Sequence, residues 1–436
     1  MGNKIKKAPV LVAKFFQLLN SRNVNYAILR NHEGLPEYYK SRDIDIIIDK
    51  KQFLNIRKEI KDTIEDEKFM ITTYFESERI HTFVCGKISK GGCELLQLDF
   101  FFHTSAYGTI LLDKKQILDS RVFENGIYHV SKEYEFLDKY LYLKYLGYPY
   151  PSKYAYLREK VKHSKCLDSI LTKEFGINSL QELEQMNTSD LKKITKCKLS
   201  INRLKNKLDF YKWYLQNLLV PRGFSLGFTG PDGAGKTAVA DRVMLELGKV
   251  YPRILIFHHR PALIGNLGEV AHRSGLKNEI DRQFDKPHRG SRKGIVNSIL
   301  RLAYYSTDYV AGYFIKVRIH LQKRSIIIFD RYYTDTICDS QRSSIYLSHK
   351  FLYWFGRLFI PSLRYNILLT ADSQTILERK QELNKEGIDA INHKIDYLAT
   401  KKGYYKILNE GTPQEAVEKI LQIIFEEQHK MNIKRL

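Results

Sequence analysis

Hydrophobic and polar residues alternate along much of residues 1–125, with the period of two that is typical of strands. Two further stretches have the wider apolar spacing of amphipathic helices. Together they predict a small α+β sheet of about five strands. We expect helices at 9–22 and 51–65, and strands at 26–30, 43–48, 69–75, 81–86 and 94–102.

The period changes twice further along the chain. Residues 126–220 carry Lys, Leu and Tyr at helical spacing, which predicts a basic helical connector that ends at VPRG. Residues 221–436 alternate strands with helices, and the strands are near-continuous apolar runs. Such runs are typical of a parallel sheet buried on both faces. We therefore expect an α/β domain with strands at 224–230, 253–259, 325–330 and 364–371.

The composition limits the class of protein. A chain of 436 residues is too long for one ordinary core. No apolar run reaches the length of a membrane-spanning helix, and no signal-peptide pattern is present. Five cysteines without paired spacing indicate a reducing compartment, so we expect a cytoplasmic protein.

The net charge of +22 favours an anionic partner. Nucleotides, phosphorylated substrates, nucleic acid and an anionic membrane surface all satisfy this expectation. A lysine-rich composition without functional meaning is the competing explanation.

The stretch GPDGAGKT, residues 230–237, matches the phosphate-binding pattern G-x-x-x-x-G-K-[ST] between a predicted strand and a predicted helix. Glycines let backbone amides turn around a phosphate, and the helix amino terminus adds its dipole. Lys236 is expected to reach the transferred phosphate and Thr237 to hold Mg²⁺. The pattern predicts a site for ATP or another nucleoside triphosphate, formed by Gly230, Gly233, Ala234, Gly235, Lys236 and Thr237.

Two charged residues follow a later strand. Asp330 ends the predicted strand 325–330, and Arg331 comes next. Ligands of open α/β sheets bind beyond the carboxyl ends of the strands, so Asp330 is placed to order Mg²⁺ and Arg331 to add a cation there. We therefore expect a P-loop kinase, that is, a phosphotransferase.

These residues, together with HRP at 259–261, DRYY at 330–333 and ILERKQE at 376–382, resemble the thymidylate kinase family of nucleoside monophosphate kinases. The resemblance covers residues 224–436. The stretches DRYYTDTICDSQR and ADSQTILERKQEL are similar, more narrowly, to the thymidylate-kinase-like proteins of bacterial surface-polysaccharide loci.

The resemblance to thymidylate kinases also implies roles for single residues. Asp232 would face a hydroxyl of the acceptor, and Arg331 with Arg260 would hold the acceptor's anionic group. Arg379 and Lys380 would be lid cations that close over the transferred phosphoryl group, where negative charge develops.

The stretch SRDIDIIID, residues 41–49, places Asp43 and Asp45 on one face of a strand and isoleucines on the other. Asp99 is a lone acid in the apolar strand ELLQLDFFF. Three converging carboxylates repel one another unless divalent cations bridge them. The pattern predicts a two-metal site that activates a hydroxyl and steadies a leaving pyrophosphate.

This half, over about residues 10–150, resembles the polymerase-β-like nucleotidyltransferase superfamily. Where that superfamily places a Gly-Ser pair before the D-x-D, this chain has Arg30 and Asn31, and Arg30 could contact a phosphate instead. Three interpretations stay open: an active transferase, a substrate-binding or scaffold domain, and a solvated strand.

The sequence thus predicts an ATP- and Mg²⁺-dependent kinase of a small nucleotide- or sugar-type acceptor, fused to a nucleotidyltransferase-like domain. The resemblance implies a role in surface-polysaccharide synthesis, in the cytoplasm or at the inner face of the membrane, and a homodimer stays open. The alternative is a kinase and nucleotidyltransferase that process nucleic-acid ends. In that case the basic connector, its tyrosines and Trp213 would form the binding surface.

Overall fold

The chain folds into two compact units. The computed structural model describes residues 6–41, 43–197, 201–219, 223–249, 251, 253–258, 260, 261, 263 and 294–436. The first unit comprises Met1–Lys87, Glu94–Asn217 and Phe425–Leu436, and the second comprises Ile88–Cys93 and Leu218–Ile424.

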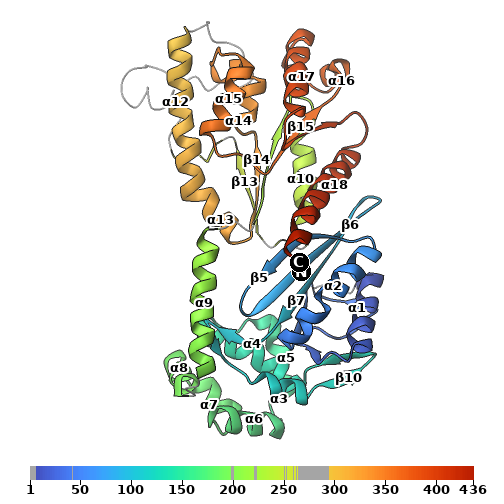
Figure 1. Cartoon of the computed structure of the whole chain (residues 1–436), viewed down its shortest axis with the longest axis vertical. Helices are drawn as coiled ribbons and strands as arrows, with labels where there is room; N and C mark the ends of the chain where they lie inside the picture. The colour runs from blue at the N-terminus through green and yellow to red at the C-terminus, as the bar shows by residue number, and fades with distance from the viewer. Residues whose placement is uncertain are drawn as a thin grey trace. The chain divides into compact units, whose positions relative to one another are not determined.

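A seven-stranded mixed sheet forms the centre of the first unit, in the order β10-β11-β2-β4-β7-β6-β5 (Figure 1). The strands predicted between 26 and 102 are confirmed. Their bounds are β2 (Tyr26–Ile28), β4 (Asp43–Ile48), β5 (Met70–Glu76), β6 (Ile80–Ser89) and β7 (Gly92–Phe101).

The sheet has two strands more than the alternating pattern predicts. β10 (Val122–Glu124) and β11 (Ile127–His129) form an antiparallel hairpin. Asn125 and Gly126 take the positive φ values of 51° and 79° that a two-residue hairpin turn requires. The expectation of about five strands was two too few, and β11 lies within the region expected to be helical. The Asn-Gly pair was the signal for this hairpin.

Helices cover both faces of this sheet. On one face, Phe15 of α1 (Val10–Ser21) and Phe53 of α2 (Lys50–Asp66) share a buried core with Ile46. On the other face, Leu137 of α4 (Lys132–Leu146) shares a core with Ile47. Neighbouring residues of β4 therefore serve opposite faces, as the alternation of a strand demands.

The region predicted as a helical connector supplies most of the remaining helices of the first unit, up to Asn217. Its role as a connector stays a prediction. The helices and short strands of this unit not yet named are α3 (Lys114–Asp119), α5 (Ala155–Val161), α6 (Lys165–Phe175), α7 (Leu180–Gln185), α8 (Thr188–Cys197), α9 (Ile201–Leu219), β1 (Lys6–Lys7), β3 (Tyr38–Tyr39), β8 (Ser105–Ala106) and β9 (Thr109–Ile110).

The second unit has the expected α/β architecture, with helices on a five-stranded parallel sheet in the order β13-β14-β12-β15-β16 (Figure 1). The strands are β12 (Ser225–Thr229), β13 (Ile254–His258), β14 (Ile326–Asp330), β15 (Tyr365–Thr370) and β16 (Tyr404–Leu408). Its helices are α10 (Lys236–Leu247), α12 (Ile295–Gly312), which continues as a π-helical turn (Tyr313–Val317), α13 (Arg318–Gln322), α14 (Tyr333–Cys338), α15 (His349–Phe359), α16 (Ser373–Arg379), α17 (Lys385–Ala399) and α18 (Pro413–Asn432).

The end of α18 belongs to the first unit, where Asn432 donates a hydrogen bond to the carbonyl of Ile71 at 3.0 Å. Among the described helices, none has the length and apolar character needed to cross a membrane.

Candidate functional site

The predicted phosphate-binding loop, residues 230–237, lies between β12 and α10, as the sequence predicts. Gly233 and Gly235 have φ values of 92° and 85°, where a side chain would strain the backbone. At Gly230, a Cβ atom would lie 2.0 Å from the carbonyl oxygen of Leu369 in β15. All three glycines are therefore required by the path of the loop, which leads directly into the amino terminus of a twelve-residue helix.

Lys236, the first residue of α10, folds back over the loop. Its Nζ donates hydrogen bonds to the carbonyls of Gly230 at 2.8 Å and Pro231 at 2.9 Å, and lies 3.5 Å from Asp232 Oδ1. The side chain is buried, and this burial, together with the nearby Arg331, lowers the pKa of Lys236. The amine thus donates its hydrogen bonds to carbonyl groups of the loop. A phosphate oxygen is a stronger acceptor and could replace these carbonyl groups.

Asp232, inside the loop, is the centre of a charge cluster. Its carboxylate accepts hydrogen bonds from Arg331 and, at 2.6 Å, from Nη1 of Arg342. Burial would raise the pKa of Asp232, but Lys236, Arg331 and Arg342 together hold it well below its usual range. The carboxylate is therefore ionised, and three cationic side chains converge on it.

Both the side chain and the backbone of Arg331 have distinctive features. Its Nη1 donates to Asp335 at 2.9 Å, and its backbone has a φ of 73°, in the left-handed region. Such conformations are uncommon for residues with a side chain and gather at functional sites. Arg342 was not among the predicted site residues, although it closes the DRYYTDTICDSQR stretch that carries the resemblance.

The two predicted Mg²⁺ ligands lie at the same edge of the sheet. Asp330 ends β14 and is paired in register with Phe228 of β12, the strand that leads into the loop. Its Oδ2 lies 3.3 Å from Nδ1 of His258. Thr237 is exposed in the first turn of α10. A hydroxyl and a half-buried carboxylate at the loop fit Mg²⁺, which prefers oxygen ligands, so the residues present are compatible with ATP and Mg²⁺.

The predicted lid cations lie beside the loop. Arg379, at the end of α16, donates to the carbonyl of Asn409 at 2.7 Å, and Nδ2 of Asn409 donates to the carbonyl of Ala234 at 2.8 Å. Arg379 is thus linked to the back of the loop through Asn409. Lys380 is exposed and pairs with Glu382 at 2.7 Å. Their role as lid cations stays a prediction.

Arg260 has a partner on another element. Its Nη1 lies 3.3 Å from Oδ2 of the buried Asp308 in α12, and its guanidinium lies 4.5 Å from the ring centre of Tyr305. His259, which the HRP motif includes, lies outside the described residues. The acceptor-binding role of Arg260 is therefore a prediction that these contacts do not address.

The three acids of the first unit converge as the sequence predicts. β4 and β7 pair in parallel with Asp45 opposite Asp99 and Asp43 opposite Gln97. One carboxylate oxygen each from Asp43, Asp45 and Asp99 can be chosen so that all three lie within 4.8 Å of one another. This geometry fits a divalent cation, which takes oxygen ligands from several carboxylates.

A cationic side chain already contacts this triad. Nε of Arg30 lies 2.8 Å from Asp45 Oδ2, and Nη1 of Arg30 lies 2.8 Å from Oδ2 of Asp138 in α4. The pKa of Asp45 rises to about 7, because burial and the neighbouring Asp43 and Asp99 outweigh Arg30. Arg30 forms ion pairs with Asp45 and Asp138, and its contact with a phosphate stays a prediction. The sequence had not indicated Asp138.

The other two acids of the triad accept hydrogen bonds from neutral donors. Asp99 accepts from Thr82 Oγ1 at 2.5 Å and from Gln97 Nε2 at 2.8 Å, and Asp43 accepts from Ser41 Oγ at 2.7 Å. These hydrogen bonds orient the carboxylates of Asp43 and Asp99 within the triad.

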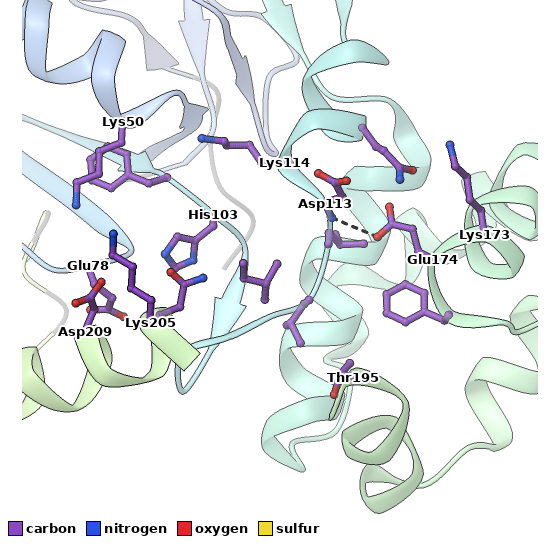
Figure 2. Close-up of a pocket in the computed structure, with 17 residues that line it drawn as sticks. Lys50, Glu78, His103, Asp113, Lys114, Lys173, Glu174, Thr195, Lys205 and Asp209 are labelled. Carbon is purple, nitrogen blue, oxygen red and sulfur yellow. Dashed lines mark hydrogen bonds between the residues drawn. The ribbon is translucent and has the colours of Figure 1, made fainter. Parts of the chain in front are cut away.

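The first unit also contains a cavity of about 650 Å³ (Figure 2). Figure 2 shows Lys50, Lys205, Glu78, Asp209 and His103 gathered on one side of it. Its size is that of a small-molecule site, and charges of both signs line it together with aromatic side chains.

No family model matches the chain, and no curated protein matches it. Among solved structures, the thymidylate kinase from Ehrlichia chaffeensis is similar with 14% identity and a TM-score of 0.32, over 46% of this chain and 98% of that chain.

Proposed function

We propose that the second unit is an ATP- and Mg²⁺-dependent phosphotransferase that acts on a small nucleotide- or sugar-type acceptor. The observation that carries the proposal is the loop 230–237 with the buried Lys236, beside the cluster of Asp232, Arg331 and Arg342. A phosphate-binding loop would bind the triphosphate of the donor. An ionised acid flanked by arginines would bind an acceptor that bears both a hydroxyl and an anionic group.

Each residue of this site has a separate role in the proposal. Lys236 and the loop amides bind the donor phosphates, and Thr237 with Asp330 would hold Mg²⁺, which neutralises charge on the phosphates when bound. Asp232 accepts a hydrogen bond from an acceptor hydroxyl, while Arg331 and Arg342 bind the acceptor's anionic group. Arg379, Lys380 and Arg260 would supply further positive charge as the site closes.

For the first unit, we propose nucleotidyl transfer through a metal site at Asp43, Asp45 and Asp99. The convergence of the three carboxylates supports this activity. Arg30 partly neutralises the site in the absence of a cation, and it would turn toward a triphosphate when the carboxylates take up metal. The cavity of Figure 2 is the candidate pocket for a polar small molecule in the same unit.

The proposed biological setting rests on the sequence resemblance. We propose a role in surface-polysaccharide synthesis, and a location in the cytoplasm or at the inner face of the membrane. Whether the chain forms a homodimer stays open. The competing proposal is nucleic-acid end processing, which the net charge of +22 supports. Binding to single-stranded nucleic acid that weakens steeply with salt would favour it, and no binding at low salt would exclude it.

An acceptor screen with γ-labelled ATP tests the kinase proposal. Nucleosides, nucleotides, sugars and sugar phosphates are offered to the wild type, to Lys236→Ala and to the control Lys385→Ala, which removes an exposed lysine of α17. We expect transfer by the wild type and the control, and a loss of at least about a hundredfold in Lys236→Ala. Equal transfer by all three would refute the proposed site.

The transferase proposal is tested in parallel with α-labelled nucleoside triphosphates. The double variant Asp43→Asn/Asp45→Asn is expected to lose incorporation of label into any acceptor while it keeps γ-phosphoryl transfer. If it matches the wild type with every triphosphate and acceptor, the first unit is not a transferase that uses these acids.

A further inference from the structure

A second group of metal-ligating side chains lies in the first unit, on the β10–β11 hairpin and on the loop that follows β2. His129 is at the end of β11, opposite Ile28 of β2, and Glu124 is at the end of β10. His32 comes from the loop, and its ring stacks on that of His129 with centroids 3.8 Å apart and planes 5° apart. The three side chains line a cavity of about 160 Å³.

The hydrogen bonds of His129 determine which ring nitrogen can act as a ligand. Nδ1 lies 2.9 Å from the carbonyl oxygen of Val130, and a carbonyl can only accept, so Nδ1 carries the hydrogen. In the neutral ring Nε2 then presents a lone pair. A backbone carbonyl bound to the far nitrogen is the usual arrangement that fixes the tautomer of a metal-binding histidine.

The nitrogen atoms facing the cavity lack hydrogen-bond partners. Nδ1 of His32 and Nε2 of His129 are buried, and neither has such a partner among the described residues. Nε2 of His129 lies 3.4 Å from Oε2 of Glu124. A neutral ring would direct its lone pair at the carboxylate, and two acceptors at that distance repel each other unless a proton or a metal ion lies between them.

We propose that His32, Glu124 and His129 bind a divalent transition-metal ion, with Zn²⁺ as the leading candidate. Two imidazoles and one carboxylate form a known Zn²⁺ ligand set that leaves the fourth position open to water. Imidazole nitrogen favours Zn²⁺ and related ions over Mg²⁺ and Ca²⁺, which prefer oxygen ligands. One ligand atom from each of the three residues already lies within 4.8 Å of the others.

Binding requires a small closure. Bonds of about 2.0–2.1 Å in a tetrahedral site place ligand atoms roughly 3.3 Å apart. Because the two rings are nearly parallel, one imidazole must also tilt so that both lone pairs point at the ion. Glu124 is exposed on the hairpin and can move toward the histidines at low cost.

The site would fasten the β10–β11 hairpin to the loop that leads from Arg30. Arg30 lies two residues before His32 and contacts Asp45 and Asp138. A bound ion would therefore stabilise the part of the first unit that positions Arg30, and this prediction does not depend on either proposed catalytic activity.

The test is titration of the metal-stripped, tag-free full chain with Co²⁺, followed by the visible absorption of the bound ion, and then displacement by Zn²⁺. With excess Mg²⁺ present to occupy the carboxylate triad, we expect one Co²⁺ per chain with absorption bands typical of nitrogen and oxygen ligands, and displacement of this ion by Zn²⁺. Glu124→Gln and His32→Asn should each weaken binding by at least about tenfold.

Two controls separate this site from other sources of binding. His163→Asn removes an exposed histidine and should leave the Co²⁺ spectrum unchanged. Asp43→Asn/Asp45→Asn removes two acids of the carboxylate triad and should abolish only the Co²⁺ binding that excess Mg²⁺ displaces, while the bands of the histidine site remain. Circular dichroism of each metal-free variant reports whether it folds. Glu124→Gln is the variant least able to disturb the fold, because Glu124 is exposed. No stoichiometric binding by the wild type, or binding unchanged in both Glu124→Gln and His32→Asn, would overturn the proposal.

Discussion

Asp45 and Asp232 are both carboxylates beside arginines, yet their protonation differs. Asp232 faces Lys236, Arg331 and Arg342, and its pKa is held well below its usual range. Asp45 is buried beside two other acids with Arg30 as its cation, and its pKa rises to about 7. The balance of charges around each acid, more than the acid itself, decides whether a site attracts an anionic group or a further cation.

Arg342 gives a prediction for the proposed kinase site. Since Asp232 keeps Arg331 and Lys236 as partners, Arg342→Ala should leave the loop intact and remove one cation from the acceptor side. We expect the KM of the acceptor to rise roughly tenfold, the loss of about one charge-assisted hydrogen bond, with the KM of ATP changed less than about threefold. Initial rates with an acceptor from the screen measure both constants.

The control for this prediction is Arg357→Ala, which removes an exposed arginine of α15. It should change neither KM. A larger effect of Arg342→Ala on the KM of ATP than on that of the acceptor would contradict the assignment of Arg342 to the acceptor.

His81 predicts how the stability of the first unit depends on pH. Burial, aided by Lys50 and Arg57, lowers its pKa to about 4, while Glu76 opposes this shift. Between about pH 4 and 6.5 the unfolded chain therefore binds more protons at His81 than the folded chain, and stability rises with pH. The wild type should lose about 1.5 kcal/mol more than His81→Gln between pH 6.5 and pH 5.

Urea unfolding at the two pH values measures this loss. A Trp354→Phe background leaves Trp213, which donates to the carbonyl of Glu76 at 2.9 Å and so reports on the first unit. His32 and His103, whose pKa values burial also lowers to about 4, act in the same direction in both proteins. Equal pH dependence in the wild type and His81→Gln would refute the assignment.

At the scale of elements, the register between strands determines which acids converge, and spacing along the sequence cannot determine this. Asp43 and Asp45 are two residues apart, so their shared face follows from the sequence, whereas Asp99 reaches them only because β4 and β7 pair in parallel with Asp45 opposite Asp99. A shift of one residue in that register would turn Asp99 to the other face and bury it among isoleucines and phenylalanines.

The close approach of β12 and β15 beneath the loop gives the next prediction. Gly230→Ala would place a Cβ atom 2.0 Å from the carbonyl oxygen of Leu369, which is backbone and cannot move aside alone. We expect the second unit to lose at least about 2–3 kcal/mol of stability, and ATP binding to weaken, because the strands must separate. Thermal unfolding and ATP titration measure the two effects.

Gly294→Ala is the matched control, since a Cβ atom there would meet nothing within 4 Å and its φ is −56°. It should change stability by no more than about 0.5 kcal/mol. A Gly230→Ala variant as stable as Gly294→Ala would show that the strands adapt more easily than this packing implies.

For the whole molecule, we predict that the two sites can be inactivated separately. The first unit has core clusters on both faces of its sheet, and the second unit has clusters of its own. In the full chain, Lys236→Ala should abolish phosphoryl transfer and leave Mn²⁺ binding at the carboxylate triad unchanged, while Asp43→Asn/Asp45→Asn should have the opposite effects. Calorimetric titration with Mn²⁺ and the transfer assay measure the two activities, and loss of both in either variant would indicate coupled sites.

The sequence alone determined the features that depend on neighbours along the chain. Alternation placed β2, β4, β5, β6 and β7, and near-continuous apolar runs placed the central strands of the second unit. The loop 230–237 could be located because its glycines are required by the local backbone conformation, which the sequence pattern itself records. The local Asn-Gly signal of the β10–β11 hairpin went unused, and with it two strands of the first sheet; β16 of the second sheet was not predicted either.

The tertiary structure decided which charged and metal-ligating side chains contact one another. Arg331 and Arg342 meet Asp232 from 99 and 110 residues away, and Arg30 meets Asp138 from 108 residues away. The meeting of His32 with His129 and Glu124 is likewise a product of the strand order β10-β11-β2. Sequence periodicity reports which face a residue occupies, but charge compensation and ligand geometry depend on distances between segments, and these are set only when the sheets and helices pack.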